Sequence, residues 1–199
     1  MKKSKIGVLY EFNERCLCPL ERQFLPKLKK WRNLQIKVLR QFKLLTDYDQ
    51  EKWFENLSED EHQLIFGIIT FDEKREKEVL IGYCGITNID FKNRRGEISF
   101  LVDPDRVKDE KLYREDFLSV LYMLCKCGFE ELNLNKLFTE TFSFRKNHLR
   151  ILEEFGFKSD GTLRSHHFTC GQYYDSIIHS LLFSEWKQKQ EKIRNEFEK

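Results

Sequence analysis

The first part of the chain carries two hydrophobic patterns, short apolar runs and longer segments with apolar residues at helical spacing. The run Arg15–Leu20 is typical of a strand, and Lys5–Tyr10 is apolar enough for another strand or a docked arm. Helical spacing predicts three helices, over Glu21–Trp31, Asn33–Gln41 and Asp47–Leu57. Pro26 lies in the first turns of the first helix, where proline is tolerated, and Thr46 or Asp47 can cap the third.

The hydrophobic pattern then changes from helical spacing to runs that are typical of strands. Stretches rich in β-branched and aromatic residues predict three successive strands, over Gln63–Phe71, Val79–Ile89 and Glu97–Val102. Charged residues at 72–78 and at Lys92–Arg95 suit the turns between them, so we expect an antiparallel meander. A helical period over Glu115–Leu132 predicts the longest helix.

The last third returns to short elements. It predicts a strand, a helix that stops at Gly156, and two further strands around Gly171. The strands cover Asn135–Phe144, Phe157–Phe168 and Tyr173–Phe183, and the helix covers His148–Phe155. The charged stretch Trp186–Lys199 has no apolar face, so we expect a solvated helix there. This order predicts a mixed α/β (α+β) arrangement around one sheet.

Composition narrows the class of protein. A chain of 199 residues, 40% hydrophobic and 34% charged, suits a single globular domain, here expected over residues 1–186 with a charged helical tail at 187–199. A net charge of +2 gives no global field for nucleic acid. The chain shows neither a secretory signal nor an apolar stretch of membrane length. We therefore expect a cytoplasmic protein without nucleic-acid or membrane partners.

Six cysteines raise the question of a metal site. Cys16 and Cys18 form one C-x-C pair and Cys125 and Cys127 another, and neither matches the C-x-x-C spacing common in zinc sites. Reduced thiols are the rule in a cytosol. We expect buried or half-buried thiols and no metal.

Seven segments together resemble the RimJ/RimL-like branch of the GNAT N-acetyltransferases, in the family's order and spacing. They are Pro19–Asn33, Thr46–Leu57, Ile81–Phe100, Cys127–Phe142, Ile151–Phe157, Asp160–Ser176 and Ser180–Trp186. The resemblance implies about seven mostly antiparallel strands, splayed at the centre and flanked by helices. It also implies acetyl-CoA as co-substrate, bound in the gap, and transfer of its acetyl group to a primary amine. The acceptor would be an amino sugar, a protein N-terminus or a small amine, and the protein a monomer or homodimer.

Acetyl transfer needs a group that accepts the amine proton and donors for the acyl carrier. The resemblance makes Glu97, in the motif EISF, the candidate base. The alternative is a strand carboxylate that pairs with Arg94, Arg95 or another cation. Unpaired backbone groups of the following residues would hold the pantetheine arm, namely Phe100, Leu101 and Val102.

The family usually places a glycine-rich turn before its long helix, where backbone N–H groups bind the diphosphate. In this chain the aligned stretch is EKLYREDF, and Glu110, Leu112 and Arg114 stand at the glycine positions. The cofactor contacts implied here are Lys111, Leu112, Tyr113, Arg114, Glu115 and Asp116. The alternative is a plain helix N-terminus whose acidic residues suit its dipole.

A second departure lies in the later helix, where the family carries an N-x-x-S pattern. Arg145 and His148 stand at those positions. His148 can protonate or stabilise a leaving thiolate, because histidine titrates near neutrality, or it is a surface residue. Arg145 can reach a phosphate of the cofactor or remain a solvent-exposed charge.

Candidate acceptor contacts lie between the early helices and near the last hairpin. They are Arg32, Asn33, Trp53, His166 and Tyr173. Aromatic residues at such positions more often pack than bind. The missing glycines also motivate a second hypothesis, a binding or scaffold module of the same fold that has lost its acetyl-CoA chemistry.

Overall fold

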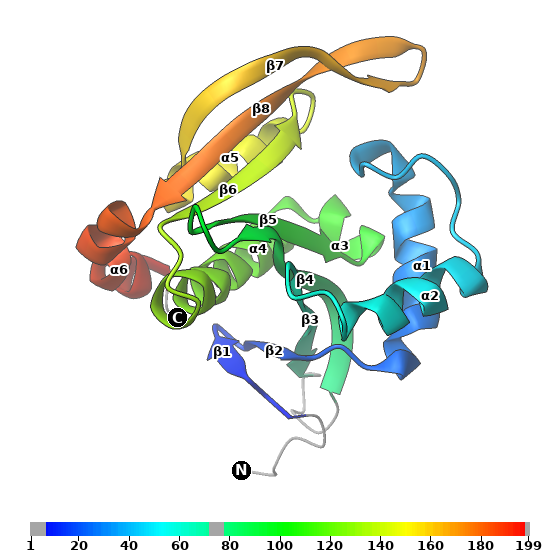
Figure 1. Cartoon of the computed structure of the whole chain (residues 1–199), viewed down its shortest axis with the longest axis horizontal. Helices are drawn as coiled ribbons and strands as arrows, with labels where there is room; N and C mark the ends of the chain where they lie inside the picture. The colour runs from blue at the N-terminus through cyan, green and yellow to red at the C-terminus, as the bar shows by residue number, and fades with distance from the viewer. Residues whose placement is uncertain (1–6, 72–77, 198–199) are drawn as a thin grey trace.

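The computed structural model describes residues 7–71 and 78–197, and in these ranges eight strands form one mixed sheet (Figure 1). Their spatial order is β1-β2-β3-β4-β5-β6-β8-β7. The strands are β1 (Tyr10–Phe12), β2 (Arg15–Pro19), β3 (Leu64–Phe71), β4 (Glu78–Asp90), β5 (Arg95–Val102), β6 (Lys136–Phe142), β7 (Lys158–Thr169) and β8 (Gln172–Leu182).

All neighbouring strands pair antiparallel except β5 and β6, which pair in parallel. The meander β3-β4-β5 follows the predicted order, and each predicted strand between residues 63 and 183 is present with shifted ends. The sheet has one strand more than the resemblance implied. The predicted turn at residues 72–78 lies outside the described residues except for its last position.

Helices cover both faces of the sheet (Figure 1). They are α1 (Leu25–Leu34), α2 (Asp47–Leu57), α3 (Pro104–Lys108), α4 (Glu110–Cys125), α5 (Lys146–Phe155) and α6 (Phe183–Phe197), with 3₁₀ turns η1 (Arg22–Phe24) and η2 (Ile36–Val38) and a π-helical turn η3 (Lys126–Glu131). Apolar residues of α1 pack with β2, β3 and β4 in one cluster, whereas those of α4, α5 and α6 build the larger cluster. The sheet therefore lies between two helical layers.

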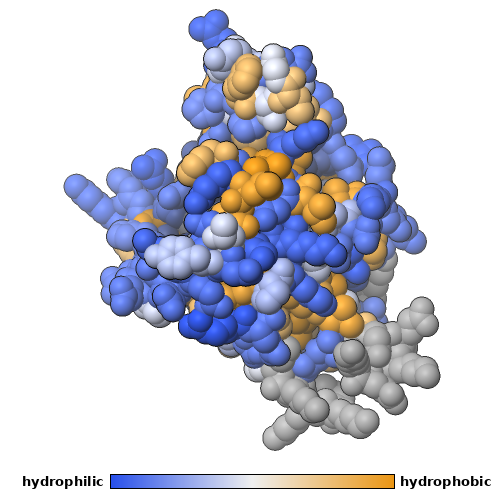
Figure 2. Space-filling model, turned by 90° about the vertical axis from the view of Figure 1, so that its right-hand side faces the viewer, coloured by the Kyte–Doolittle hydropathy of each residue, from blue (hydrophilic) through white to orange (hydrophobic). Residues whose placement is uncertain are grey.

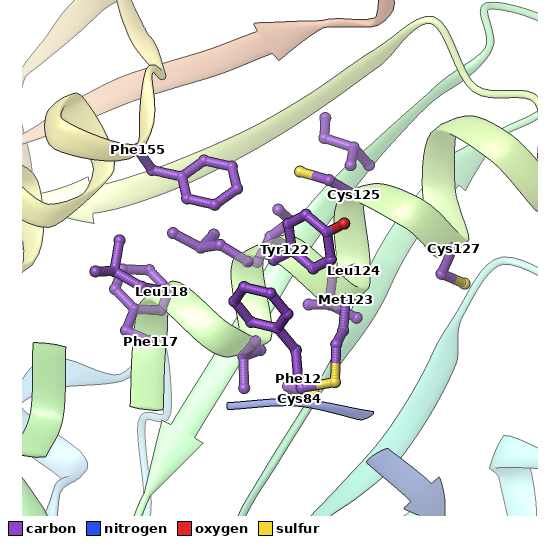
Figure 3. Close-up of a cluster of buried hydrophobic side chains, with 14 of the residues drawn as sticks. Phe12, Cys84, Phe117, Leu118, Tyr122, Met123, Leu124, Cys125, Cys127 and Phe155 are labelled. Atoms are coloured by element: carbon purple, nitrogen blue, oxygen red, sulfur yellow. The ribbon is translucent and has the colours of Figure 1, made fainter. Parts of the chain in front are cut away.

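The larger cluster centres on α4, which is buried along almost its whole length after the first turn (Figure 3). Phe12 from β1 stacks on Tyr122 with ring centroids 4.2 Å apart, and Tyr122 meets Trp186 of α6 edge to face at 5.5 Å. Aromatic pairs of this kind add to the stabilisation from burial. Strand β1 and helix α6, which lie near opposite ends of the described chain, therefore both pack on α4.

The predicted helix over Asn33–Gln41 is wrong. The chain instead leaves α1, makes the single turn η2 and continues without regular structure to α2. The side chain of Asn33 bonds both the carbonyl oxygen and the N–H of Leu45, at 2.9 and 2.8 Å. Such side-chain bonds to the backbone compete with helical ones, which explains the loop.

Two further helices differ from their predicted form. Helix α4 begins at Glu110, five residues before the predicted start, with Asp109 as its cap. Helix α6 extends to Phe197 as a helix, but Ile193 and Phe197 are buried in the larger cluster. The prediction of a solvated tail is therefore wrong, because Trp186, Ile193 and Phe197 are buried and dock this helix.

The cysteine side chains are mostly in the core. Five of the six are buried and Cys170 is exposed. Burial raises the pKa of the Cys16 and Cys18 thiols to about 12, so both are neutral at pH 7. Among the described residues, no group of three or more His, Cys, Asp or Glu side chains is arranged to hold a metal ion. None of the described helices is both long enough and apolar enough to cross a membrane.

Candidate functional site

The sheet opens between its two parallel strands. Strands β5 and β6 are paired only over Arg95–Glu97 and Lys136–Phe138, and beyond these residues they separate. On its other side β5 stays paired with β4 up to Val102. The edge of β5 that faces β6 therefore leaves backbone N–H and C=O groups unpaired, and such groups require other partners. The splayed centre implied by the sequence is present.

A cavity of about 90 Å³ occupies this opening and reaches both faces of the sheet. On the side of α4 and α5 it is lined by Phe100, Phe117 and His148, and Phe100 stacks on Phe117 with centroids 4.5 Å apart. On the other side it is lined by Val38 and Arg40 from the segment after α1. A molecule in the opening can therefore be approached from both helical layers.

Two hydroxyl groups of β6 line the cavity without a partner among the described residues. They belong to Thr139 and Thr141, whose side chains are almost fully buried. A buried hydroxyl without a hydrogen bond costs about 1–3 kcal/mol. Together with the free edge of β5, these hydroxyls suit a ligand with amide groups along an extended chain, as the pantetheine arm of CoA has. In this part of the opening the residues fit the implied co-substrate.

Two carboxylates face the cavity from opposite strands. Glu97 on β5 is aligned with Phe138, so it lies on the same face of the sheet as Glu140, two residues further along β6. The guanidinium of Arg40 pairs with both, at 3.1 Å from Glu140. Asn88 donates to the second oxygen of Glu97 at 2.7 Å. Glu97 does pair with a cation, but the cation is Arg40 and not Arg94 or Arg95.

Three polar side chains meet below the opening. The phenol oxygen of Tyr113 is 2.7 Å from Nδ1 of His148, and Arg145 donates to the same oxygen at 3.1 Å. Burial, with a smaller effect of the positive charge on Arg145, lowers the pKa of His148 well below its usual value. Burial also raises the pKa of Tyr113, partly opposed by Arg145. Both groups are therefore neutral at pH 7.

The stretch aligned with the diphosphate loop is helical. Asp109 accepts a hydrogen bond from the N–H of Leu112 at 3.0 Å, and Glu110 and Lys111 are exposed in the first turn of α4. A carboxylate thus occupies the position at the helix end that favours anions. None of the residues at 110–112 lines the cavity. This end of the site fits a diphosphate less well than the opening fits the pantetheine arm.

The next residues of α4 are engaged elsewhere. Arg114 pairs with Glu154, and its Nε lies 3.0 Å from Oε2 of that carboxylate. Its guanidinium lies over the ring of Phe197. Asp116 is fully buried and bonds Arg15 at 2.9 Å and Arg106 at 2.6 Å. Its carboxylate holds three segments together and is not placed to meet a diphosphate.

Glu115 also points to Arg15, at 3.3 Å. Of the three pantetheine contacts predicted on β5, only Phe100 lines the cavity. Ile98, Ser99 and Phe100 line the cavity, whereas Leu101 is buried among the residues of α1 and the carbonyl of Val102 accepts from Gln35 at 2.8 Å.

The predicted acceptor contacts are not brought together. The guanidinium of Arg32 lies over the ring of Trp53, 5.4 Å from its centroid, and neither lines the cavity. Asn33 fixes the loop after α1, as described above. Tyr173 is exposed and packs on Phe168. Of these residues, His166 lies nearest the opening, with Nε2 3.7 Å from Glu140.

Sequence reasoning missed several residues that line the cavity, namely Arg40, Phe117, Thr139, Glu140 and Thr141, and also Asn88, which donates to Glu97. The sequence did carry a signal for Glu140. Side chains alternate between the two faces of a strand, so the predicted strand places Glu140 on the face opposite to Thr139 and Thr141. No local signal existed for Arg40, which lies in irregular chain 57 residues before Glu97.

Comparison with known proteins identifies the family to which this fold and cavity belong. Residues 20–178 match the family described as "Acetyltransferase (GNAT) domain", and they span most of the chain. The chain belongs to the GNAT acetyltransferase family. The cavity between β5 and β6 is therefore the candidate active site of a GNAT domain.

Two relatives from Bacillus are similar over part of the chain. The uncharacterized N-acetyltransferase YoaA of Bacillus subtilis (strain 168) is 29% identical over 111 residues, which cover 55% of this chain and 59% of YoaA. The uncharacterized N-acetyltransferase p20 of Bacillus licheniformis is 29% identical over 112 residues, 56% of this chain and 60% of p20. The matches therefore span well short of the full length of either relative.

Solved GNAT structures share the fold. A spermidine N-acetyltransferase from Vibrio cholerae, in complex with CoA and spermine, superposes with a TM-score of 0.77 at 19% identity, covering 87% of this chain and 98% of that one. Mutant forms of the spermidine/spermine N-acetyltransferase SpeG from the same organism give a TM-score of 0.73 at 20% identity. The match covers 89% of this chain and 98% of that one. At such identities the likeness establishes the fold alone.

Proposed function

We propose that this GNAT domain transfers the acetyl group of acetyl-CoA to a primary amine. The observation that carries the proposal is the separation of β5 from β6 after Glu97, which opens a polar-lined cavity through the sheet. The names of the relatives support it: each relative that we describe is named an N-acetyltransferase. The narrower resemblance to the RimJ/RimL-like branch rests on the sequence motifs alone and is part of this proposal.

Each part of the cavity has a role in this reaction. When bound, acetyl-CoA supplies an activated acyl group as a thioester. The edge of β5 at Ile98–Phe100 and the hydroxyls of Thr139 and Thr141 would hold its pantetheine arm. Glu97 would accept the proton of the amine, directly or through water. Arg145, which lines the cavity, would bind a phosphate.

The leaving thiolate needs a proton, and we assign its source to Tyr113. His148 was the sequence-based candidate, but burial keeps its ring neutral, so it has no imidazolium proton to give at pH 7. The Tyr113 hydroxyl keeps its proton, because burial raises its pKa. His148 then acts as a positioning residue that holds the hydroxyl at 2.7 Å.

The alternative is a GNAT-fold binding module with weakened acetyl-CoA chemistry. The observation that favours it is the carboxylate of Asp109 at the N-terminus of α4, where a diphosphate would bind. Weak binding of the diphosphate lowers the affinity for the whole co-substrate.

Calorimetric titration with acetyl-CoA, followed by an assay of free thiol with a panel of amines, tests the proposal. We expect saturable binding and thiol release that depends on the amine. Binding without thiol release from any amine would support the binding module. No heat and no thermal shift at millimolar acetyl-CoA would exclude the transferase and favour a scaffold module that has lost its acetyl-CoA chemistry. Cytoplasmic location and a monomeric or homodimeric state stay predictions.

A further inference from the structure

The Arg40 guanidinium is an exposed group inserted between two buried carboxylates. Its side chain is 52% exposed, whereas those of Glu97 and Glu140 are 4% and 11% exposed. Most exposed arginines reach outward to water, because a hydrated guanidinium gains little from a surface ion pair. Here one cation bridges two largely buried carboxylates on opposite sides of the sheet opening, so a single positive charge faces two negative ones.

Arg40 also stands where two hollows meet. The inner cavity contains Glu97, and a larger outer hollow of about 320 Å³ is lined by Phe42, His166, His167 and Phe168. Arg40 and Glu140 line both. The face seen in Figure 2, viewed from the right-hand side of Figure 1, carries apolar residues in patches among hydrophilic ones, most of them in its upper half. Phe42 is 92% exposed and Phe168 is 59% exposed, so the outer hollow has an apolar rim.

The segment that carries Arg40 is anchored at both ends. Gln35 donates to the carbonyl of Val102 at 2.8 Å, and Asn33 bonds the backbone of Leu45. Gln41 donates to the same Asn33 side chain at 3.1 Å. The backbone is therefore held while the long side chain of Arg40 extends from it into the site. A swing of this side chain needs no unfolding.

We propose that the Arg40 guanidinium occupies the position of a cationic group of the acceptor, and that an amine with a second positive charge must displace it to bind. This inference rests on the proposed function. Removal of Arg40 leaves two buried carboxylates uncompensated, which is costly unless new cations replace it. A diamine meets this demand: one amine reaches Glu97 and reacts, and the other pairs with Glu140.

The surroundings suit such an acceptor. The apolar rim of Phe42 and Phe168 suits a methylene spacer, which gains from contact with apolar surface. Displacement of Arg40 also releases Glu97 from its ion pair, so that its carboxylate becomes free to accept a proton from the reacting amine. The acceptor would thus switch on the base that its own reaction needs. Thr139, whose buried hydroxyl has no described partner, lines the same cavity beside Glu140.

Direct binding of a diamine tests the inference separately from acetyl transfer. Calorimetry would measure 1,4-diaminobutane and butylamine against the wild type and Arg40→Ala, with and without CoA. We expect Arg40→Ala to bind the diamine at least about ten-fold more tightly than the wild type does, because the diamine no longer has to displace an internal cation. The increase in affinity for butylamine should be smaller. Glu140→Gln should lose the diamine. Lys37→Ala, an exposed cation on η2, is the matched control and should resemble the wild type.

Arg40→Gln provides a second variant if Arg40→Ala proves unstable, and it should change binding in the same direction. Diamine affinity that is unchanged or weaker in both variants would overturn the inference, as would equal gains for the diamine and butylamine. The thiol-release assay separates the two proposals. Diamine binding that responds to Arg40 without acetyl transfer would uphold the inference as a binding property and refute the proposed reaction. Transfer that is indifferent to Arg40 and Glu140 would refute only the inference.

Discussion

Tyr113 and His148 form a hydrogen bond of 2.7 Å beneath the opening of the sheet, although 35 residues separate them in the chain. Arg145 also donates to the Tyr113 oxygen. In the proposed reaction His148 carries its proton on Nδ1 and donates it to the same oxygen, which leaves the phenol proton free to reach the thiolate. The pair places a neutral hydroxyl beside the cavity wall formed by Phe100 and Phe117. Its position makes Tyr113, rather than His148, the proton donor of the proposed reaction.

The neutrality of His148 predicts how stability depends on pH. Because the pKa of His148 is lowered in the folded state, the unfolded chain takes up the proton first as the pH falls below about 6.5. This residue should therefore cost up to about 1.4 kcal/mol of unfolding free energy per pH unit in that range. Urea unfolding between pH 7.5 and 5 should show a flatter profile for His148→Gln, with exposed His166→Gln as the control. Parallel profiles for the wild type and His148→Gln would contradict the assignment.

Asp116 predicts a large effect on stability. Its carboxylate is fully buried between Arg15 and Arg106, so Asp116→Asn removes the carboxylate that pairs with Arg106 and leaves Arg15 with Glu115 at 3.3 Å. Loss of one partner from a buried ion pair costs about 3–5 kcal/mol. The control is Asp105→Asn, which breaks only the exposed pair with Lys108 and should cost less than about 1 kcal/mol. Denaturant unfolding measures both, and similar losses would show that the Asp116 network is not structural.

Glu97 predicts an effect on turnover. If its carboxylate accepts the amine proton, Glu97→Gln should lower kcat by about 10²–10⁴-fold and leave the affinity for acetyl-CoA nearly unchanged. Steady-state kinetics together with calorimetry separate the two quantities. Glu59→Gln, on the exposed surface after α2, should alter neither. An equal loss of turnover and affinity in Glu97→Gln would count against the role as base.

We expect substitution of Thr141 to act differently on the stability of the fold and on the affinity for CoA. Its buried hydroxyl lacks a described partner, so Thr141→Val should leave the unfolding free energy unchanged or raise it. If the hydroxyl binds the pantetheine arm, the binding free energy of CoA should weaken by the net contribution of one hydrogen bond, about 0.5–1.5 kcal/mol. Calorimetry with CoA and urea unfolding measure the two effects, and exposed Thr162→Val is the control. An undiminished affinity would remove Thr141 from the binding site.

Much of the fold was predictable because its signals are local. Runs rich in β-branched and aromatic residues placed β3 to β8 within a few residues. Thr46 caps α2 through a capping box with Asp49, and Gly156 ends α5 at a φ of 115°. Each of these depends on neighbours in sequence. The helix predicted over Asn33–Gln41 failed because the Asn33 side chain bonds a backbone twelve residues away, which no local pattern records.

The sequence by itself determined the order of most elements and the resemblance to the family. It also proposed Glu97, Phe100, Arg145 and His148 as site residues, with a structural or surface alternative left open for Glu97, Arg145 and His148. Only the tertiary structure showed that β5 and β6 part after three pairs and that Asp116 is a buried ion-pair partner. It alone brought Arg40 between Glu97 and Glu140. The physical reason is that hydrophobic periodicity specifies which face of an element is buried, whereas ion pairs between distant charged residues depend on how the elements pack.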